Sequence, residues 1–306
     1  MKTHPLYPMI FAPVYKDYIW GGQRIAAEYN RGGTPSPCAE SWELSGLSCG
    51  ESIIANGAFE GIGLAHLAQT FGPELTGTAA PHPEIFPLLI KIIDAADRLS
   101  VQVHPDAEAA AELGGQSKHE MWYVLDTKPD SVIWAGIEPG SDPADAPNHL
   151  LAHAVRPGDI FDIPAGLVHA IGAGNLIYEV QQPSNTTYRI SDWGRGRETH
   201  LAQSIRSIHP ELHPLQLSDS DISREFCPRL VTPDFTFATL DIRRQRTMAT
   251  KAKSPMALFC ASGKVSLEHC GPHPLTLLPG DLVLVPPSQR FELHPLAPTR
   301  LLVSSL

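Results

Sequence analysis

Short apolar runs separated by proline and glycine are the feature that most constrains how this chain can fold. Its 306 residues include 29 prolines and 24 glycines, which lie mostly between apolar runs such as 87–93 and 282–285. Proline interrupts helices and central strands, and glycine permits tight turns, so this pattern is typical of short strands joined by turns. The sequence therefore predicts a mainly β protein.

Apolar alternation and capping residues predict where the strands and the few helices lie. The predicted helices are 64–71, 107–113 and 198–208. The predicted strands are 41–45, 87–93, 100–104, 121–125, 131–137, 160–163, 176–180, 187–190, 235–242, 256–260, 264–269, 275–278, 282–285 and 301–304. A polar, irregular stretch follows Pro210, as is common between domains. We therefore expect two domains, 1–210 with the helices and 211–306 built of strands.

One internal repeat connects the two predicted domains. Residues 157–169 align without a gap on residues 279–291, and a proline, a glycine, an aspartate and a second proline recur in register. The last position of the repeat is His169 in the first copy and Phe291 in the second. If the repeat is structural, the first copy carries chemistry and the second carries only structure.

The charge of the chain excludes one class of partner. The formal net charge is −10 and 18% of the residues are charged, with no basic stretch interleaved with aromatic residues that could follow a nucleic-acid backbone. We therefore expect no nucleic-acid partner. An acidic surface does not attract an anionic substrate, so a local group of lysine and arginine side chains must hold such a substrate.

Cysteine content and hydropathy predict a soluble, cytoplasmic protein. The five cysteines form no Cys-x-x-Cys pair, which is typical of reduced thiols in the cytosol. The first twenty residues contain three prolines, Lys16 and Asp17, and no apolar run is long enough to cross a bilayer. We expect no membrane partner and a monomeric protein.

Four polar side chains form a plausible metal-binding set. Strand alternation sends Ser100, Gln102 and His104 to one face of a predicted strand. Glu120 enters the next strand, and His169 follows a proline-glycine turn at the start of another. Two imidazoles, a carboxylate and an amide oxygen suit Zn²⁺, and manganese or iron would accept the same set.

Glu179 is the most informative of the other polar residues. It lies within the apolar run 176–180, where an acid costs free energy unless it is paired or faces a polar cleft. Lys118 and Arg189 each have an ordinary explanation, as a solvated loop lysine and as a surface partner of Asp192.

Several motifs resemble those of type I phosphomannose isomerases. Residues 157–169 resemble the second motif of cupins, with Gly158, Pro164, Gly166 and His169 in place and Asn175 two positions later than the motif asks. The segment 91–106 resembles the signature of type I phosphomannose isomerases. Further matches are 20–22, 39–43, 118–123, 169–173 and 185–192. These motifs cover the first predicted domain, and the chain most resembles the short bacterial branch of the family.

The resemblance implies two cupin-like jelly rolls or β-barrels, with a small helical insertion and one zinc ion in the first and no metal in the second. The family's metal ligands fall on Gln102, His104, Glu120 and His169. Its catalytic residues fall on Lys118, Glu179 and Arg189. Its substrate-binding positions fall on Trp20, Glu40 and Ser100.

The resemblance further implies an isomerase that interconverts mannose 6-phosphate and fructose 6-phosphate by zinc-assisted proton transfer through an enediolate. Glu179 or a water molecule at the zinc is expected to be the base, and Lys118 to move the proton between oxygens. Arg189 is expected to orient C1 and C2 or to hold the phosphate. Two alternatives stay open, namely another metal-dependent cupin enzyme, such as an epimerase or oxygenase, and a non-catalytic sugar-phosphate-binding cupin.

Three positions depart from the family pattern. Longer members often have aspartate where this chain has Ile19, and tyrosine where it has Ile171. Some members have histidine where this chain has Ser117. These differences leave open which group opens the sugar ring.

Overall fold

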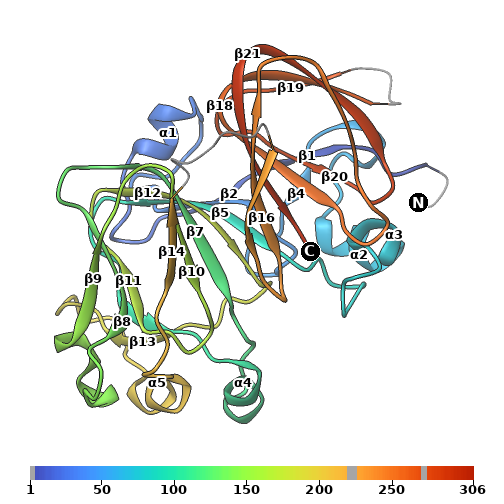
Figure 1. Cartoon of the computed structure of the whole chain (residues 1–306). Coiled ribbons are helices and arrows are strands. Elements are labelled where there is room, and N and C mark those ends of the chain that lie inside the picture. The colour runs from blue at the N-terminus through green and yellow to red at the C-terminus, as the bar shows by residue number, and fades with distance from the viewer. Residues whose placement is uncertain (1–3, 219–225, 270–273) are drawn as a thin grey trace. The chain divides into compact units, whose positions relative to one another are not determined.

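Most of the regular structure is antiparallel β-sheet, which confirms the predicted mainly β class. The structure is a computed structural model that describes residues 4–218, 226–269 and 274–306. The chain divides into two units, one made of Met1–Val14, Trp42–Leu89 and Asp221–Leu306 and the other of Tyr15–Ser41 and Ile90–Ser220 (Figure 1). This division differs from the predicted domains 1–210 and 211–306, because two N-terminal segments belong to the unit of the C-terminal strands.

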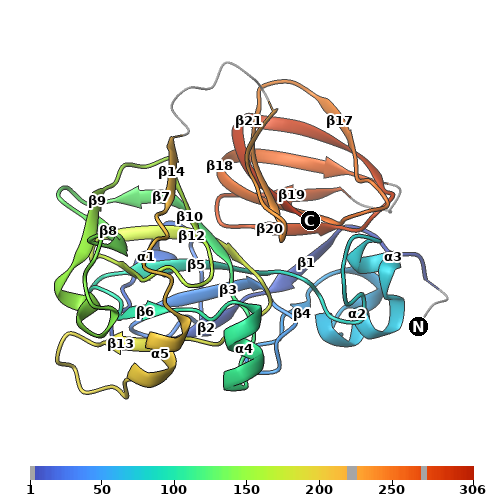
Figure 2. The ribbon, with the colours of Figure 1, turned by 60° about the horizontal axis from the view of Figure 1, so that its bottom comes forward.

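The first unit contains a nine-stranded sheet with a central order of β15-β16-β21-β18-β20-β1-β4, in which β17 pairs with β21 and β19 with β18 (Figure 2). Its strands are β1 Met9–Ala12, β4 Ile53–Ile54, β15 Phe226–Val231, β16 Thr236–Ile242, β17 Arg246–Ala249, β18 Met256–Glu268, β19 Leu275–Leu277, β20 Leu282–Val285 and β21 Arg290–Ser305. Its helices are η1 Gly57–Phe59, α2 Leu64–Phe71 and α3 Pro73–Thr76. β1 pairs antiparallel with β20, with Met9 opposite Leu284, which explains why the N-terminus joins this unit.

The second unit contains most of a seven-stranded sheet in the order β14-β10-β7-β12-β5-β3-β2, of which residues 42–44 in β3 belong to the first unit, and a five-stranded sheet in the order β13-β6-β11-β8-β9. The strands of the first of these sheets are β2 Val14–Lys16, β3 Glu40–Leu44, β5 Leu89–Ala95, β7 Glu120–Thr127, β10 Asp159–Ile163, β12 Asn175–Gln181 and β14 Leu215–Ser218. Those of the second are β6 Val101–Val103, β8 Val132–Ile137, β9 Leu150–Ala154, β11 His169–Ile171 and β13 Tyr188–Ser191. The helices are α1 Arg24–Glu28, α4 Ala107–Leu113, η2 Pro143–Asn148 and α5 Leu201–Ser207.

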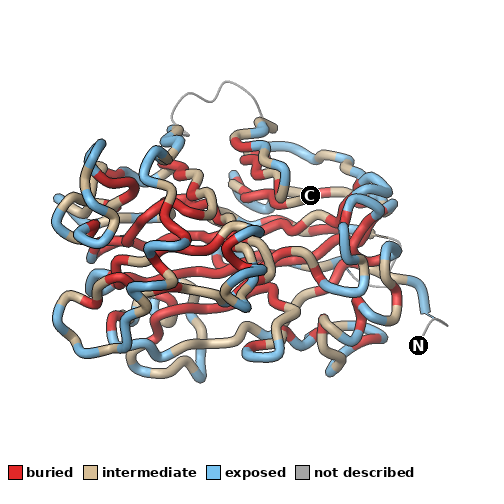
Figure 3. The backbone as a smooth tube through the Cα atoms, turned by 90° about the horizontal axis from the view of Figure 1, so that it is seen from below, coloured by how far each residue is buried: buried red, intermediate tan, exposed pale blue. Residues whose placement is uncertain are grey.

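The two sheets of the second unit enclose a common core. Trp122 and Phe161 from the larger sheet belong to one buried apolar cluster with Ile133 and Ile171 from the smaller sheet. Figure 3 colours each residue by its burial, and β5 and β12 are buried at every position. The sheets therefore pack face to face, as in a β-sandwich.

The smaller sheet has a second apolar face. Val101 and Val103 pack there in a separate cluster with Ile208, which directly follows α5. Gln102 lies between them in β6 and lines the cleft described below. The alternation predicted for this strand is therefore present, and it turns Gln102 toward the space between the two sheets.

The internal repeat folds as the same turn in both units. Gly158 and Gly280 have φ values of 92° and 93°, a region that favours glycine. The next residue in each copy, Asp159 or Asp281, accepts a hydrogen bond through its carboxylate from the backbone N–H three positions earlier. Phe291, which replaces His169 in the second copy, is buried in an apolar cluster of the first unit. The second copy is therefore structural at this position.

We expect the Gly280→Ala variant to be destabilised by about 1–2 kcal/mol, because a Cβ atom is strained at a φ near +93°. Gly32→Ala is the matched control, since nothing lies within 4 Å of an added Cβ there. The comparison is made by urea denaturation of both variants. Equal unfolding free energies for the two variants would contradict the strain argument.

Two predicted strand boundaries were wrong for the same reason. Residues 256–260 and 264–269 were predicted as two strands, but they belong to the continuous strand β18. Gly263 has a φ of 86° and lies where the register of β18 against β21 shifts. A glycine inside a strand pattern can mark a β-bulge as well as a turn, and here it marks the bulge.

Candidate active site

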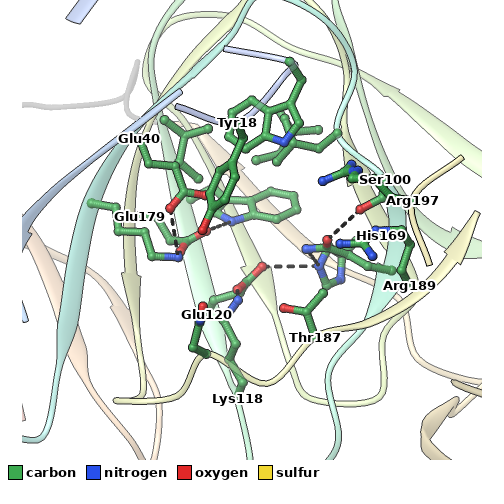
Figure 4. A pocket seen from close by; sticks show the side chains of 18 residues that line it. Tyr18, Glu40, Ser100, Lys118, Glu120, His169, Glu179, Thr187, Arg189 and Arg197 are labelled. Atoms are coloured by element: carbon green, nitrogen blue, oxygen red, sulfur yellow. Dashed lines mark hydrogen bonds and ion pairs between the residues drawn. The ribbon is translucent and has the colours of Figure 1, made fainter. Parts of the chain in front are cut away.

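A cleft in the second unit brings together nine of the ten predicted site residues (Figure 4). They are Trp20, Glu40, Ser100, Gln102, Lys118, Glu120, His169, Glu179 and Arg189. The tenth, His104, is buried next to the cleft, with its ring centroid 4.8 Å from that of His169. The sequence prediction therefore selected residues that are close together in space.

Three of these side chains form a buried group that could hold a metal ion. One ligand atom from each of His104, Glu120 and His169 lies within 4.8 Å of the others. Nε2 of His104 is 3.3 Å from Oε2 of Glu120, and Nε2 of His169 is 3.4 Å from Oε1 of Glu120. Two imidazoles and a carboxylate around one point are a typical ligand set of a catalytic zinc site.

Hydrogen bonds to the backbone orient both imidazoles toward this point. Nδ1 of His104 is 2.9 Å from the carbonyl oxygen of Thr186, and Nδ1 of His169 is 2.9 Å from that of Leu167. A carbonyl oxygen only accepts, so each Nδ1 carries the proton and each Nε2 offers a lone pair. This is the arrangement that orients metal-binding histidines in proteins.

Gln102 is positioned to add a fourth ligand atom. It is opposite His169 in the β6–β11 pairing, and its amide group is 3.2 Å from Nε2 of His169. Its other amide atom accepts a hydrogen bond from the hydroxyl of Ser100 at 3.2 Å. A half-turn of the amide exchanges its nitrogen and oxygen, so Gln102 can present either atom to this point.

Charges around the group favour an ionised Glu120 and neutral imidazoles. Burial, with a contribution from the Lys118 ammonium, lowers the pKa of His104 to about 3. Burial also lowers the pKa of His169. Burial alone would raise the pKa of Glu120, but the positive charge of Lys118, whose Nζ is 2.8 Å from Oε2, holds it well below the usual value. These protonation states are the ones that bind a metal cation.

A second charged group occupies the cleft around Glu179. Nζ of Lys91 is 2.8 Å from Oε1 of Glu179 and 3.9 Å from Oε2 of Glu40. The indole N–H of Trp122 donates to the other oxygen of Glu179 at 3.0 Å. Burial raises the pKa of Glu179, although Lys91 opposes this. A buried carboxyl group with a raised pKa is a candidate for proton transfer near neutral pH.

Arg189 and Arg197 also line the cleft and add positive charge to that of Lys91 and Lys118. Arg189 donates through Nη1 to the carbonyl oxygen of Glu198 at 2.7 Å, while its buried Nε has no hydrogen-bond partner. Arg197 binds the carboxylate of Asp192 through Nε at 2.9 Å and Nη2 at 2.5 Å. Arg195 also binds Asp192, at 2.9 Å. Arg189 therefore has a donor left for an anionic ligand, and Asp192 orients Arg197.

We expect Asp192→Asn to lower the free energy of unfolding at pH 7 by about 1–2 kcal/mol. Hydrogen bonds from Arg197, and then from Arg195, lower the pKa of Asp192 to about 2. Lowering the pKa of Asp192 from an ordinary value near 3.9 corresponds to about 2.5 kcal/mol of folding free energy. The arginines are partly exposed, so we expect a smaller contribution. A lowered pKa means that this stability is present above about pH 4 and is lost as the pH falls toward 2.

Urea denaturation at several pH values measures this effect. The difference between the wild type and Asp192→Asn should shrink as the pH is lowered from 4 toward 2. Asp97→Asn is the control, because Asp97 is 59% exposed in its pair with Arg195 and such pairs contribute little. If the difference in unfolding free energy between the wild type and Asp192→Asn stays constant with pH, the stabilising role of the ionised Asp192 is contradicted.

Several residues that line the cleft were not predicted from the sequence. They are Tyr18, Ile93, Leu99, Asn185, Thr187 and Arg197, and above all Lys91. Lys91 lies in β5, whose seven residues are all buried. Only the position of β5 between β12 and β3 shows that this lysine meets Glu179 and Glu40. The signal available was the presence of a lysine in an otherwise apolar run, which requires a buried partner.

Within the described residues, no helix is long and apolar enough to cross a membrane. None of the four cysteines described by the structure, Cys38, Cys49, Cys227 and Cys260, forms a disulfide. Cys270 lies outside the described residues.

Comparison with known proteins identifies relatives of this chain. Residues 9–136 match the family described as phosphomannose isomerase type I, catalytic domain. The chain is 38% identical over 242 residues to mannose-6-phosphate isomerase ManA of Bacillus subtilis, a match that covers 70% of this chain and 72% of that protein. It is 40% identical over 202 residues to the mannose-6-phosphate isomerase of Streptococcus mutans, covering 61% of this chain and 63% of that protein.

A solved structure resembles the whole chain. The crystal structure of the mannose 6-phosphate isomerase from Bacillus subtilis superposes with a TM-score of 0.87 at 27% identity and covers 98% of this chain and 99% of that one. This likeness confirms the predicted cupin-like fold class. The family match ends before His169, Glu179 and Arg189, so the second half of the cleft rests on the geometry described above.

Proposed function

This chain belongs to the type I phosphomannose isomerase family, and we propose that it interconverts mannose 6-phosphate and fructose 6-phosphate with one zinc ion held by Gln102, His104, Glu120 and His169. The observation that carries the proposal is the buried His-Glu-His group, which lies in one cleft with a carboxylate of raised pKa and with two arginines. Aldose-ketose isomerisation needs a base, stabilisation of a developing oxyanion and a binding site for the phosphate, and this cleft contains a group suited to each.

A buried carboxylate oxygen without a well-aligned hydrogen bond supports the proposed zinc site. Glu120 is 1% exposed, and its Oε2 has no hydrogen-bond partner of good geometry although Lys118 lies 2.8 Å away. A buried carboxylate oxygen of this kind, together with two imidazole lone pairs, is what a divalent cation satisfies. When bound, zinc supplies Lewis acidity that stabilises negative charge on O1 or O2 of the sugar.

Glu179 is the proposed base that takes the proton from C1 or C2. The Trp122 N–H and the Lys91 ammonium hold its two oxygens and leave the carboxylate facing the cleft. Its raised pKa gives it a greater basicity than an exposed glutamate has, which improves proton abstraction from carbon.

Lys118 and Arg189 complete the proposed set. Nζ of Lys118 is 3.1 Å from Nε2 of His104, so the Lys118 ammonium lies beside the proposed metal ligands. From there it can move a proton between O1 and O2 of the sugar. Arg189 and the neighbouring Arg197 are proposed to hold the phosphate through donors that fit its oxygens. Trp20, Glu40 and Ser100 are proposed to contact the sugar.

A coupled assay for fructose 6-phosphate formed from mannose 6-phosphate tests the function. We expect activity in the zinc-loaded protein, loss of at least ~100-fold on chelation, and recovery when zinc is restored. A folded, zinc-loaded protein without activity would overturn the proposed reaction. Recovery with iron but not with zinc would instead favour another metal-dependent cupin chemistry. The monomeric state, the absence of a nucleic-acid partner and the cytoplasmic location stay predictions.

A further inference from the structure

Tyr18 lines the same cleft, and the proposed reaction does not use it. It is 37% exposed, whereas Glu40, Lys91 and Glu179 are 7%, 5% and 3% exposed. Figure 4 shows the Tyr18 side chain extending toward Glu40 and Glu179. A half-exposed tyrosine over buried charged groups lies at the mouth of the cleft, where a bound ligand would cover it.

The backbone that carries Tyr18 is held on both sides. The carbonyl oxygen of Lys16 accepts from the N–H of Ala39 at 2.8 Å, and that of Tyr18 accepts from the N–H of Gly21 at 2.9 Å. Gly21 lies so close to Ala39 that an added Cβ would be 2.5 Å from the Ala39 Cα. The Tyr18 ring packs on the Trp20 ring at a centroid distance of 5.6 Å. Tyr18 is therefore positioned before a ligand binds, which lowers the entropic cost of binding.

The charges in the cleft orient a sugar phosphate relative to Tyr18. The Glu40, Lys91 and Glu179 group contains two carboxylates and one ammonium, so it repels a phosphate. Arg189 and Arg197 attract one, and Figure 4 shows them on the other side of Glu120 and His169. A phosphate bound at the arginines leaves the opposite end of the sugar, C1 and C2, beside Glu179 and Tyr18.

We propose that Tyr18 is a substrate-binding residue that closes the cleft over the C1–C2 end of the sugar. Its hydroxyl, which both donates and accepts, bonds a sugar oxygen there, and its ring packs on the C–H face of the sugar. This inference rests on the proposed function, because it needs a ligand with a phosphate at one end and hydroxyl groups at the other. It assigns Tyr18 a role in recognising the length of the substrate.

Calorimetry with two inert ligands tests the role of Tyr18. Mannitol 6-phosphate has six carbons and cannot isomerise, and erythritol 4-phosphate is two carbons shorter. Each is titrated into the zinc-loaded wild type, Tyr18→Phe, Tyr18→Ala and the control Ile19→Ala. Ile19 is the neighbouring residue, is 61% exposed and is not among the residues that line the cleft.

We expect Tyr18→Phe to weaken mannitol 6-phosphate binding about 3–10-fold, which is the loss of one hydrogen bond. Tyr18→Ala should weaken it about 30–100-fold, because the packing of the ring is lost as well. Binding of erythritol 4-phosphate should change less than about twofold in both variants, since a ligand of four carbons held at the arginines does not reach Tyr18. Ile19→Ala should leave both affinities unchanged.

Two outcomes overturn the inference. Unchanged affinity for mannitol 6-phosphate in Tyr18→Ala removes Tyr18 from the binding site. Equal losses for both ligands show that Tyr18 acts through the structure of the cleft or on the phosphate. Turnover of mannose 6-phosphate by the wild type is measured in parallel, so an inactive enzyme that still shows length-dependent binding would overturn the proposed function alone.

Discussion

Replacing Glu120 by glutamine is expected to abolish both zinc binding and isomerase activity. The carboxylate is the one negative charge in the proposed ligand set, and the imidazoles of His104 and His169 meet at its two oxygens. Glutamine keeps the size of the side chain but removes the charge that balances a divalent cation. Because Lewis acidity contributes several kcal/mol to the stabilisation of an oxyanion, we expect kcat to fall by at least ~10³-fold.

Metal content and folding separate this effect from simple destabilisation. The variant also leaves the Lys118 ammonium without its carboxylate partner, so its circular dichroism and melting temperature are measured beside its zinc content. The matched control is His119→Gln, because Nε2 of His119 is 2.7 Å from Asp162 and His119 is not part of the His-Glu-His group. A folded Glu120→Gln protein that keeps one zinc per chain and full activity would refute the proposed metal site.

The residues of the candidate metal-binding group were predictable from sequence because local rules place them. Strand alternation directs Gln102 in β6, His104 follows directly after that strand, His169 follows a proline-glycine turn, and Glu120 begins β7. These rules need only residue spacing and the two-residue period of a strand. They predict where the side chains lie along the strands and turns, although not how the hydrogen bonds that the imidazoles donate to the carbonyl oxygens of Thr186 and Leu167 orient the rings.

The surroundings of Glu179 were not predictable in the same way. The isolated acid in an apolar strand indicated a cleft, and β12 is indeed buried at all seven positions. Its partner Lys91, however, lies in β5, 88 positions earlier in the chain, and the two meet only because β12 pairs between β7 and β5. Sheet order is a tertiary property, so composition and periodicity do not contain it. The same holds for Arg197, whose place in the cleft depends on the hydrogen bonds that it donates to Asp192.

The division into units also depended on tertiary pairing. The repeat 157–169 and 279–291 forms a similar turn in each unit, since both copies have a glycine with positive φ and an aspartate that accepts a backbone hydrogen bond. The predicted first domain includes residues 1–14, whereas contacts in the structure group them with the C-terminal strands, because β1 pairs with β20 far along the chain. Part of the predicted boundary region, 219–225, lies outside the described residues.

Replacing Glu179 by glutamine is expected to lower kcat about 10²–10⁴-fold while zinc content stays unchanged. Glutamine keeps a hydrogen-bond acceptor for the Trp122 N–H but cannot take a proton from carbon. The rate at which the C2 hydrogen of the sugar exchanges with deuterated water should fall by the same factor as kcat. Such a result would show that the variant is defective in proton abstraction. A fully active variant would transfer the role of base to a water molecule.

The pH dependence of kcat provides an independent test of Glu179. Burial raises the pKa of Glu179, and the base works only when it is ionised, so the acidic limb of the profile should lie above the value near 4.3 of an exposed glutamate. Lys91 opposes the rise, so removing its charge in Lys91→Met should move the limb to still higher pH. A limb that stays in place in Lys91→Met would show that another group titrates there. If the shift is seen, the two buried charges act as one unit, in which Lys91 holds the pKa of Glu179 low enough for a base that must be ionised at neutral pH.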